Sequence, residues 1–547
     1  MTAPADSART RRRNQIEQLQ GVYETDHTLG QDNIRWLGLD FHNPVFVVSA
    51  GLILVFVVLS LLIPETANQA LNATRAWIGV HFDWLFLSAG NVFVIFCLLL
   101  IVLPVGKIRI GGEEAVPDFS RLSWLSMLFA AGMGIGLMFW SVAEPVGYFT
   151  DWFGTPLGVG GGDARSAMGA TMYHWGLHPW AIYGVVALAL AFFSYNKGLP
   201  LTVRSTFYPL LGERVWGPIG HVIDVLAVLA TMFGLATSLG LGARQAAGGM
   251  AFLFGVSPGL LTQIIIIAGV TSLALVSVLR GIHGGVRVLS NLNMVLALVL
   301  LLFVILAGGL MTFFANFATT VTGYAQHILP LSNPIGRDDD VFYHNWTIFF
   351  WAWWISWSPF VGMFIARVSR GRTVREFLTA VLLVPVVVTV VWMSAFGGSG
   401  LEQVKAGVGQ LAGGIGDSSL ALFQMLQNLP FAGITSLLAI MLVLLFFITS
   451  SDSGSLVIDS ITSGGKTTAP TAQRVFWVLV EGLVAAVLLG IGGAAALEAL
   501  QAGAVSTGLP FVIVLLLMCI SLWKGLFHEQ KLLKLQRNSL AAPAAGG

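Results

Sequence analysis

Long apolar runs constrain this sequence more than any other feature. Each run is close to the ~20 residues that an α-helix needs to cross the hydrocarbon core of a bilayer. Only 10% of the 547 residues are charged, whereas soluble domains carry about 25%. The sequence therefore predicts an all-α membrane protein with twelve transmembrane helices. The runs lie at about residues 44–64, 83–105, 122–150, 168–196, 219–246, 260–280, 288–315, 342–366, 376–397, 430–460, 472–492 and 505–523.

Basic residues predict the orientation of these helices. If the N-terminus is cytoplasmic, most of the 28 Lys and Arg residues fall on the cytoplasmic side, as the positive-inside rule requires. We expect a cytoplasmic N-terminal segment (1–43), a transmembrane domain (44–523) and a short cytoplasmic tail (524–547) whose end is disordered. The basic residues expected on the opposite side are Arg75, Arg165, Arg337 and Lys405.

Composition also limits the function. A net charge of +1 argues against a nucleic-acid partner. Both cysteines, Cys97 and Cys519, lie in apolar runs, so no disulfide or metal site is expected. Neither an ATPase signature nor a nucleophile–base pair is present, so we expect no enzyme.

Two of the apolar runs carry features that a simple transmembrane helix lacks. The third run contains Gly132, Gly134 and Gly136, which disfavour a continuous helix. Tight helix packing through small residues is one explanation; a broken helix whose freed carbonyls bind a cation is another. The tenth run contains "TSSDSG" (449–454), which has no apolar side chain and offers oxygen ligands suited to a hard cation such as Na⁺.

Aromatic residues form the third unusual pattern. In "WAWWISWSPF", Trp353, Trp354 and Trp357 are spaced to share one helix ridge. They lie 13–17 residues from the basic Arg370, which is about 20–25 Å at 1.5 Å per residue and too deep for an interfacial belt. A deep aromatic box suits a quaternary ammonium ligand, held by cation–π contacts. Trp351 is the odd member, with gating or packing as its expected role.

Charged side chains inside apolar runs are costly in a membrane, so each one needs a role. We expect Glu144 to be hydrated or to cap a helix end, Arg244 to point or pair outward, and Asp452 to tie helices together. Outside the runs, segment 316–341 is amphipathic enough to lie along the membrane surface, and segment 398–429 is consistent with an interfacial or re-entrant piece.

Five motifs together closely resemble the betaine/choline/carnitine transporter family, and the resemblance runs from the first apolar run to the twelfth. It implies a LeuT-type five-plus-five inverted repeat in spans 3–12 (about 122–315 and 342–523) preceded by two extra helices, alternating access and commonly a homotrimer. The topology permits such a repeat, because an odd number of spans inverts the second copy. The motifs are "GMGIGLMFWSVAEPVGYF", "MYHWGLHPWAIY", "TMFGLATSLGLG", "WAWWISWSPFVGMFIARVSRGRTVREF" and "FFITSSDSGSLV".

The resemblance also assigns site residues. It implies aromatic substrate boxes made of Trp175, Trp180, Tyr183, Trp353, Trp354 and Trp357. It implies a Na⁺ site made of the backbone around Ala130 and Met133 with Phe446, Thr449 and Ser450. It implies part of a second ion site at Thr231 and Phe360, where Leu235 replaces the threonine of the sodium/betaine member. Choline-selective members can carry an aspartate where this chain has Gly136, which favours a zwitterion.

We therefore expect a secondary transporter in the inner (cytoplasmic) membrane, which imports quaternary-ammonium compounds by cation-coupled symport, with glycine betaine favoured and choline next. Na⁺ is the expected coupling ion, and H⁺ stays open because of Leu235. A gradient-independent carnitine/betaine-type exchanger and a proton-coupled choline importer are the alternatives. A membrane scaffold would leave the deep tryptophan ridge unexplained.

Overall fold

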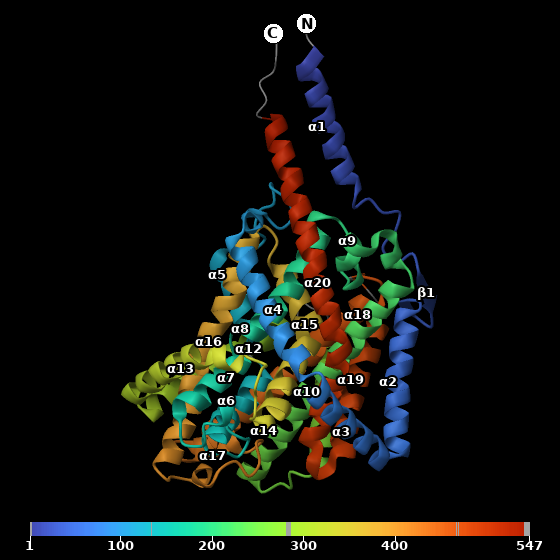
Figure 1. Cartoon of the computed structure of the whole chain (residues 1–547). Helices are drawn as coiled ribbons and strands as arrows, with labels where there is room; N and C mark the ends of the chain where they lie inside the picture. Colours follow the sequence, from blue (N-terminus) through green and yellow to red (C-terminus); the bar gives the residue numbers. More distant parts are fainter. Residues whose placement is uncertain (1–2, 133, 281–285, 467, 469, 541–547) are drawn as a thin grey trace.

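Helices make up nearly all of the regular structure in the computed structural model, which describes residues 3–132, 134–280, 286–466, 468 and 470–540 (Figure 1). The helices that correspond to the twelve apolar runs are α2 (Val45–Leu62), α4 (Asp83–Val102), α5 (Arg121–Gly132) with α6 (Ile135–Phe149), α7 (Ala164–Trp175) with α8 (Leu177–Ala191), α10 (Pro218–Phe254), α11 (Leu260–Arg280), α12 (Val286–Gly308), α15 (Ile348–Val368), α16 (Val374–Lys405), α18 (Ala432–Thr462), α19 (Thr471–Gly492) and α20 (Ala496–Leu540).

Ten stretches of helix among the described residues are, taken alone, long and apolar enough to cross a membrane. The third run is not among them because its halves, α5 and α6, are each shorter than a span. The last two runs count as one because α19 leads directly into α20. The ten stretches are therefore consistent with the twelve predicted spans.

Contacts between helices reveal the internal repeat. Exchanging α5/α6 with α15, α7/α8 with α16, α10 with α18, α11 with α19 and α12 with α20 maps many helix contacts onto one another. The contact of α8 with α15 corresponds to that of α16 with α6, and α10 with α20 corresponds to α18 with α12. The contacts α10–α19, α10–α11 and α8–α20 likewise have the counterparts α18–α11, α18–α19 and α16–α12. This is the five-plus-five inverted repeat, preceded by the two extra helices α2 and α4.

Both ends of the described chain project from the same end of the bundle (Figure 1), as an even number of spans requires. The N-terminal helix α1 (Ala3–Gly21) lies beside the C-terminal part of α20, where the Arg12 guanidinium donates to the carbonyl of Asn538 over 3.2 Å. Helix α20 continues to Leu540, so much of the expected short tail is a helical extension of the last span.

The N-terminal segment holds the one departure from an all-helical fold in the described residues. Strands β1 (Asn33–Trp36) and β2 (Leu39–His42) form an antiparallel hairpin. Its two-residue turn, Leu37 and Gly38, has positive φ at both positions (49° and 80°), which is the turn geometry that matches strand twist. The Lys466 ammonium donates to Asp40 over 2.8 Å and fastens the hairpin to the chain after α18.

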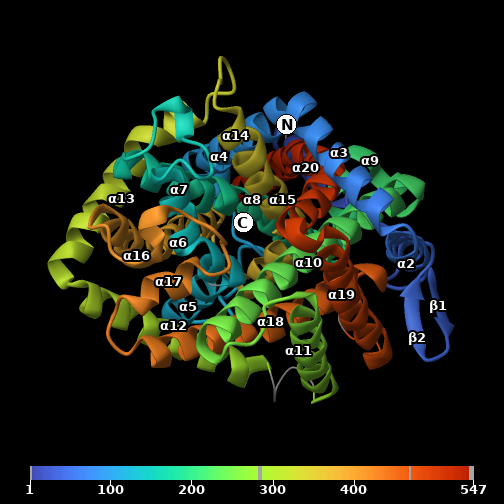
Figure 2. The same cartoon turned by 90° about the horizontal axis from the view of Figure 1, so that it is seen from below.

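Helices outside the spans correct two expected boundaries. The amphipathic segment is helix α13 (Leu310–Leu331), which starts six residues before the expected segment (316–341) and packs on α7 and α16 at the edge of the bundle (Figure 2). Segment 398–429 splits into the end of α16 and the short helix α17 (Ala421–Gln427), which is buried against α6, α16 and α18. The remaining elements are the 18-residue helix α3 (Pro64–His81) and the short elements η1 (Pro104–Lys107), η2 (Pro156–Gly158), η3 (Phe192–Asn196), η4 (Arg204–Phe207), α9 (Tyr208–Leu211), η5 (Gly212–Trp216), α14 (Asp340–Phe342), η6 (Tyr343–Thr347), η7 (Gln410–Gly413) and η8 (Gly493–Ala495).

Candidate functional site

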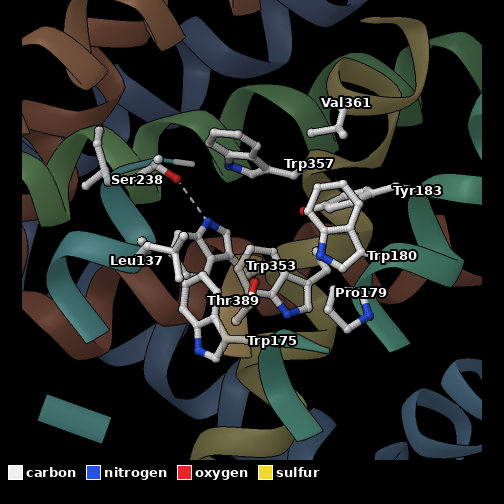
Figure 3. Close-up of a pocket in the computed structure, with 14 residues that line it drawn as sticks. Leu137, Trp175, Pro179, Trp180, Tyr183, Ser238, Trp353, Trp357, Val361 and Thr389 are labelled. Carbon is white, nitrogen blue, oxygen red and sulfur yellow. Dashed lines mark hydrogen bonds between the residues drawn. The ribbon is translucent and has the colours of Figure 1, made fainter. Parts of the chain in front are cut away.

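Aromatic side chains from α7, α8 and α15 surround a small cavity beside the first turn of α6 (Figure 3). Its volume is about 60 Å³, which suits one small molecule and no lipid or peptide. The lining residues are Gly134, Ile135, Gly136, Leu137, Trp175, Pro179, Trp180, Tyr183, Ser238, Trp353, Trp354, Trp357, Val361 and Thr389. The structure thus brings together all six aromatic residues and the glycine that the sequence predicted for a substrate site.

The rings of the box form one stacked pair and two edge-on pairs. Trp353 and Trp354 stack, with ring centroids 4.8 Å apart and planes inclined by 16°. Trp175 stands edge-on to Trp354 at 4.8 Å and 74°. Trp180 meets Tyr183 in the same edge-on manner at 5.4 Å. Several aromatic rings thus line one small cavity, and the faces of such rings attract an alkylated cation.

A break between two helices lies between Trp175 and Trp180 of the cavity. α7 ends at Trp175, Gly176 separates it from α8, and α8 begins at Leu177. A side chain at Gly176 would collide with the Tyr324 hydroxyl, 2.4 Å from an ideal Cβ. The break therefore turns the chain between Trp175 and Trp180, and the turn depends on glycine.

Gly136 forms the floor of the cavity. An ideal Cβ built there would lie 2.7 Å from Cη2 of Trp175 and 2.9 Å from Cη2 of Trp353. The ring edges therefore occupy the space that any other side chain would need. Because Gly136 has no side chain, the two rings can pack against it. The backbone of α6 also stays accessible from the cavity.

Four of the five box tryptophans donate their indole N–H groups to acceptors of the protein itself. The N–H of Trp353 donates to the Ser238 hydroxyl over 3.1 Å, and that of Trp357 donates to the Gly234 carbonyl over 2.9 Å. The N–H of Trp354 donates to the backbone carbonyl of His174 over 2.8 Å. The N–H of Trp175 donates to the Glu144 carboxylate over 2.6 Å.

Glu144 has a structural setting that the sequence interpretation missed. Its side chain is completely buried, so the expectation of hydration or a helix-end cap is wrong. One oxygen accepts from Trp175, and the other lies 2.6 Å from Nδ1 of His174 and 3.1 Å from the Tyr148 hydroxyl. A buried acid in an apolar span was the available signal, but its partners are not neighbours in the sequence.

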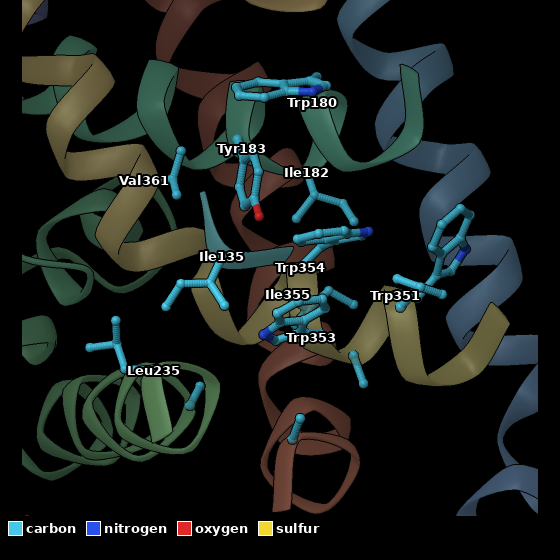
Figure 4. Close-up of a cluster of buried hydrophobic side chains, with 14 of the residues drawn as sticks. Ile135, Trp180, Ile182, Tyr183, Leu235, Trp351, Trp353, Trp354, Ile355 and Val361 are labelled. Atoms are coloured by element: carbon cyan, nitrogen blue, oxygen red, sulfur yellow. The ribbon is translucent and has the colours of Figure 1, made fainter. Parts of the chain in front are cut away.

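Trp351 points away from the cavity, toward α4 (Figure 4). It is fully buried, stacks on His178 at 5.3 Å and contacts the ring of Tyr173 at 4.9 Å. Its indole N–H has no partner among the residues that the structure describes. Of the two expected roles, packing rather than gating fits these contacts.

The predicted ion ligands are placed less completely. Ala130 lies in the last turns of α5, and Met133 lies outside the described residues. Phe446, Thr449 and Ser450 lie on α18, where the Thr449 hydroxyl donates to the carbonyl of Leu445 over 3.0 Å. This is the ordinary self-contained bond of a threonine in a membrane helix, so it does not by itself define an ion site.

The second predicted ion site has the same character. The Thr231 hydroxyl donates to the Ala227 carbonyl over 2.7 Å in its own helix, and Phe360 meets Trp357 edge-on at 5.2 Å. Leu235 is buried between α10 and α18, where its Cδ1 lies 2.4 Å from the Cβ position of Gly454. At the position where the resemblance implies a threonine, this chain has a close-packed leucine without a hydroxyl.

The other charged groups in the spans serve the packing. The Asp452 carboxylate accepts from the Ser277 hydroxyl over 2.6 Å and from the Arg474 guanidinium over 2.8 Å, which links α18 to α11 and α19 as expected. Arg244 reaches Asp417 at 3.5 Å, as the outward pairing predicted.

An enclosed aromatic cavity beside a broken helix, inside a bundle of membrane-spanning helices with an inverted repeat, defines a small-molecule membrane transporter. Residues 44–531 match the model of BCCT, the betaine/carnitine/choline family transporter, and the chain belongs to that family. It is therefore a multi-pass transporter and not an enzyme.

Named relatives are similar along nearly their whole length. Glycine betaine transporter 1 of Vibrio parahaemolyticus is 64% identical over 515 residues, which cover 93% of this chain and 98% of that protein. A glycine betaine/proline/choline/ectoine transporter of the same organism is 59% identical, covering 92% of this chain and 91% of that protein. The glycine betaine transporter OpuD of Bacillus subtilis is 42% identical, covering 90% and 96%.

Proposed function

We propose that this protein imports quaternary-ammonium compounds, with glycine betaine preferred and choline next, by cation-coupled symport with alternating access. The observation that carries the proposal is the pairing of an aromatic chamber with the uncapped first turn of α6 in one cavity. Each feature suits one end of a betaine molecule.

The aromatic chamber suits the methylated ammonium end. A trimethylammonium group has no N–H to donate and loses little hydrogen bonding when it leaves water. Faces of Trp and Tyr within about 6 Å attract such a cation with roughly 0.5–2 kcal/mol each. Trp175, Trp353, Trp354 and Trp357 offer these faces while their N–H groups are bound elsewhere.

The first turn of α6 suits the carboxylate end. The first N–H groups of a helix have no partner within it, and no side chain caps α6 at Gly134. The helix dipole adds partial positive charge at this end, so the start of a helix is a favourable place for an anion. Ile135, Gly136 and Leu137 of this turn line the cavity. The lack of an acid at Gly136 leaves this end attractive to a carboxylate, which favours betaine over choline.

The relatives support the same substrate class, because proteins with the names glycine betaine transporter and glycine betaine/proline/choline/ectoine transporter align over almost the entire chain.

We propose Na⁺ as the coupling ion, bound by backbone near Ala130 and Met133 together with Phe446, Thr449 and Ser450. The buried Leu235 argues for one Na⁺ rather than two, and H⁺ is the second candidate. We also propose that the transporter is a homotrimer in the cytoplasmic membrane with both termini inside, as the distribution of basic residues indicates.

The test is uptake of labelled betaine and choline into proteoliposomes, with Na⁺ and pH gradients imposed separately. Symport predicts uphill betaine uptake driven by an inward Na⁺ gradient, and Thr449→Val with Ser450→Ala should abolish that dependence. Betaine movement that needs no gradient and only a counter-substrate would support the exchanger instead. Uptake that follows pH alone would identify H⁺ as the coupling ion.

A further inference from the structure

Glu144 is hydrogen-bonded to one box tryptophan directly and is connected to a second through His174. Its carboxylate accepts the indole N–H of Trp175 over 2.6 Å. Its other oxygen lies 2.6 Å from Nδ1 of His174, and the backbone carbonyl of His174 accepts the indole N–H of Trp354 over 2.8 Å. Both Trp175 and Trp354 line the cavity, and Glu144 itself does not.

The His174 side chain is fixed from every direction that the described residues reveal. Its second nitrogen, Nε2, lies 2.9 Å from the Thr347 hydroxyl. Its ring is stacked between Phe350 and Phe342, with centroids 4.6 Å and 5.4 Å away. The network therefore links α6 and α7 to α14, η6 and the start of α15 behind the cavity.

Hydrogen-bond geometry fixes the ring of Trp175 in a way that packing alone does not. An indole can rotate within an apolar pocket, but its single N–H is a donor only, and a bond from it to a fixed acceptor selects one orientation. Trp175 and Trp354 meet with their planes inclined by 74°, and rotation of either ring would change the face that it offers to a cation. A binding site loses affinity when its walls are loose by as little as about 0.5 Å.

We infer that Glu144 is a positioning residue for substrate binding, which sets the orientation of Trp175 directly and of Trp354 through His174. The inference rests on the proposed function, because it assigns the carboxylate a role in binding the quaternary ammonium group. Glu144 acts as a hydrogen-bond acceptor and touches no substrate.

Two substitutions separate this role from simple filling of space. Glu144→Ala removes the acceptor and leaves the N–H of Trp175 without a partner. Glu144→Gln keeps an acceptor oxygen for Trp175, and its amide can donate to Nδ1 of His174 while Nε2–H turns to Thr347. We expect Glu144→Ala to raise both Kd and KM for betaine roughly tenfold, which corresponds to about 1.4 kcal/mol, with little change in kcat. Glu144→Gln should restore most of the affinity.

A double-mutant cycle tests whether the effect passes through Trp175. Trp175→Phe keeps an aromatic face and deletes the N–H donor, so Glu144→Ala should cost clearly less in that background than in the wild type. Trp351→Phe is the matched control, because it deletes a buried indole N–H that has no partner among the described residues and lies outside the cavity. We expect Trp351→Phe to leave Kd unchanged.

The measurements are binding and uptake of labelled betaine by the purified full-length protein, with the thermal midpoint and near-ultraviolet circular dichroism of every variant. An unchanged Kd in Glu144→Ala overturns the inference. Equal losses in the alanine and glutamine variants also overturn it, because they would assign the effect to the carboxylate's charge. If the wild type binds no betaine, the proposed function fails. The dichroism of the indoles then still decides the positioning role, and an unchanged spectrum in Glu144→Ala overturns it.

Discussion

Replacing Gly136 with alanine tests the geometry of the cavity most directly. The added Cβ would lie 2.7 Å from Cη2 of Trp175 and 2.9 Å from Cη2 of Trp353. Carbon atoms in contact prefer about 3.5–4.0 Å, so the shortfall at Trp175 is about 0.8 Å. Neither ring can retreat alone, because the N–H of Trp175 is bound to Glu144 and that of Trp353 to Ser238.

Overpacking of this kind costs about 1–3 kcal/mol. If that cost falls on the ligand-binding geometry, betaine affinity should fall by roughly 5- to 150-fold. Gly134→Ala is a close control in the same turn, since among the described residues, its chain neighbours aside, no heavy atom lies within 4 Å of a Cβ there and the backbone is extended, with φ at −170°. We expect Gly134→Ala to change the affinity much less.

The assay is equilibrium binding of labelled betaine to both purified variants, with competition by choline. The choline curve adds a second reading, because steric displacement of the rings should weaken choline as well. Equal affinity of Gly136→Ala and Gly134→Ala for betaine would refute the argument, since it would mean that the two indole rings move aside without cost.

Two further predictions concern the tryptophans of α15 and the N-terminal hairpin. Trp357→Leu should weaken betaine binding by roughly 2- to 30-fold, the equivalent of one cation–π contact of about 0.5–2 kcal/mol. Trp351→Leu, at a fully buried position outside the cavity, should lower the thermal midpoint and leave Kd unchanged; the reverse pattern would contradict the division between box and packing residues. In the hairpin, burial lowers the pKa of His42 to about 3, with Arg204 adding to the effect. Asp32, 3.6 Å away, does not offset the burial. The pKa of His42 in the folded protein lies below its ordinary value of 6.5. The contribution of the neutral His42 side chain to folding stability is therefore fully present above pH 6.5 and is lost as the pH falls from there toward 3. Thermal midpoints measured between pH 7.5 and 4 should decline less in His42→Gln than in the wild type, and parallel curves would refute this assignment.

The positions of the spans could be predicted because the bilayer imposes a length on every apolar helix. The run at 260–280 corresponds to α11 (Leu260–Arg280), and the run at 472–492 to α19 (Thr471–Gly492). Helix ends outside the membrane are set by local capping and tertiary contacts instead. The expected boundaries of α13 and α20 were therefore wrong.

The aromatic part of the site could be predicted because three of its members share one helix ridge and the other three share the motif "MYHWGLHPWAIY". The network behind it could not. Glu144 lies 30 residues from His174 in sequence, and His174 lies 173 residues from Thr347. No periodicity links such positions, because only the packing of α6, α7 and α15 brings them together. The ion ligands depended on the family resemblance, and their hydroxyls alone do not define a site.

The hydrogen bonds of the indole N–H groups in the box affect which other solutes can compete for the cavity. The indole N–H groups of four box tryptophans donate to acceptors within the protein, so these rings offer a ligand only carbon and π electrons. The four are Trp175, Trp353, Trp354 and Trp357. Ammonium, primary amines and unmethylated amino acids must give up hydrogen bonds to water to enter, and these walls return none to their N–H groups. Under the proposed function, the four tryptophans would thus favour a methylated solute, and solutes with N–H groups would depend on the few other polar groups that line the cavity, such as the Ser238 and Thr389 hydroxyls.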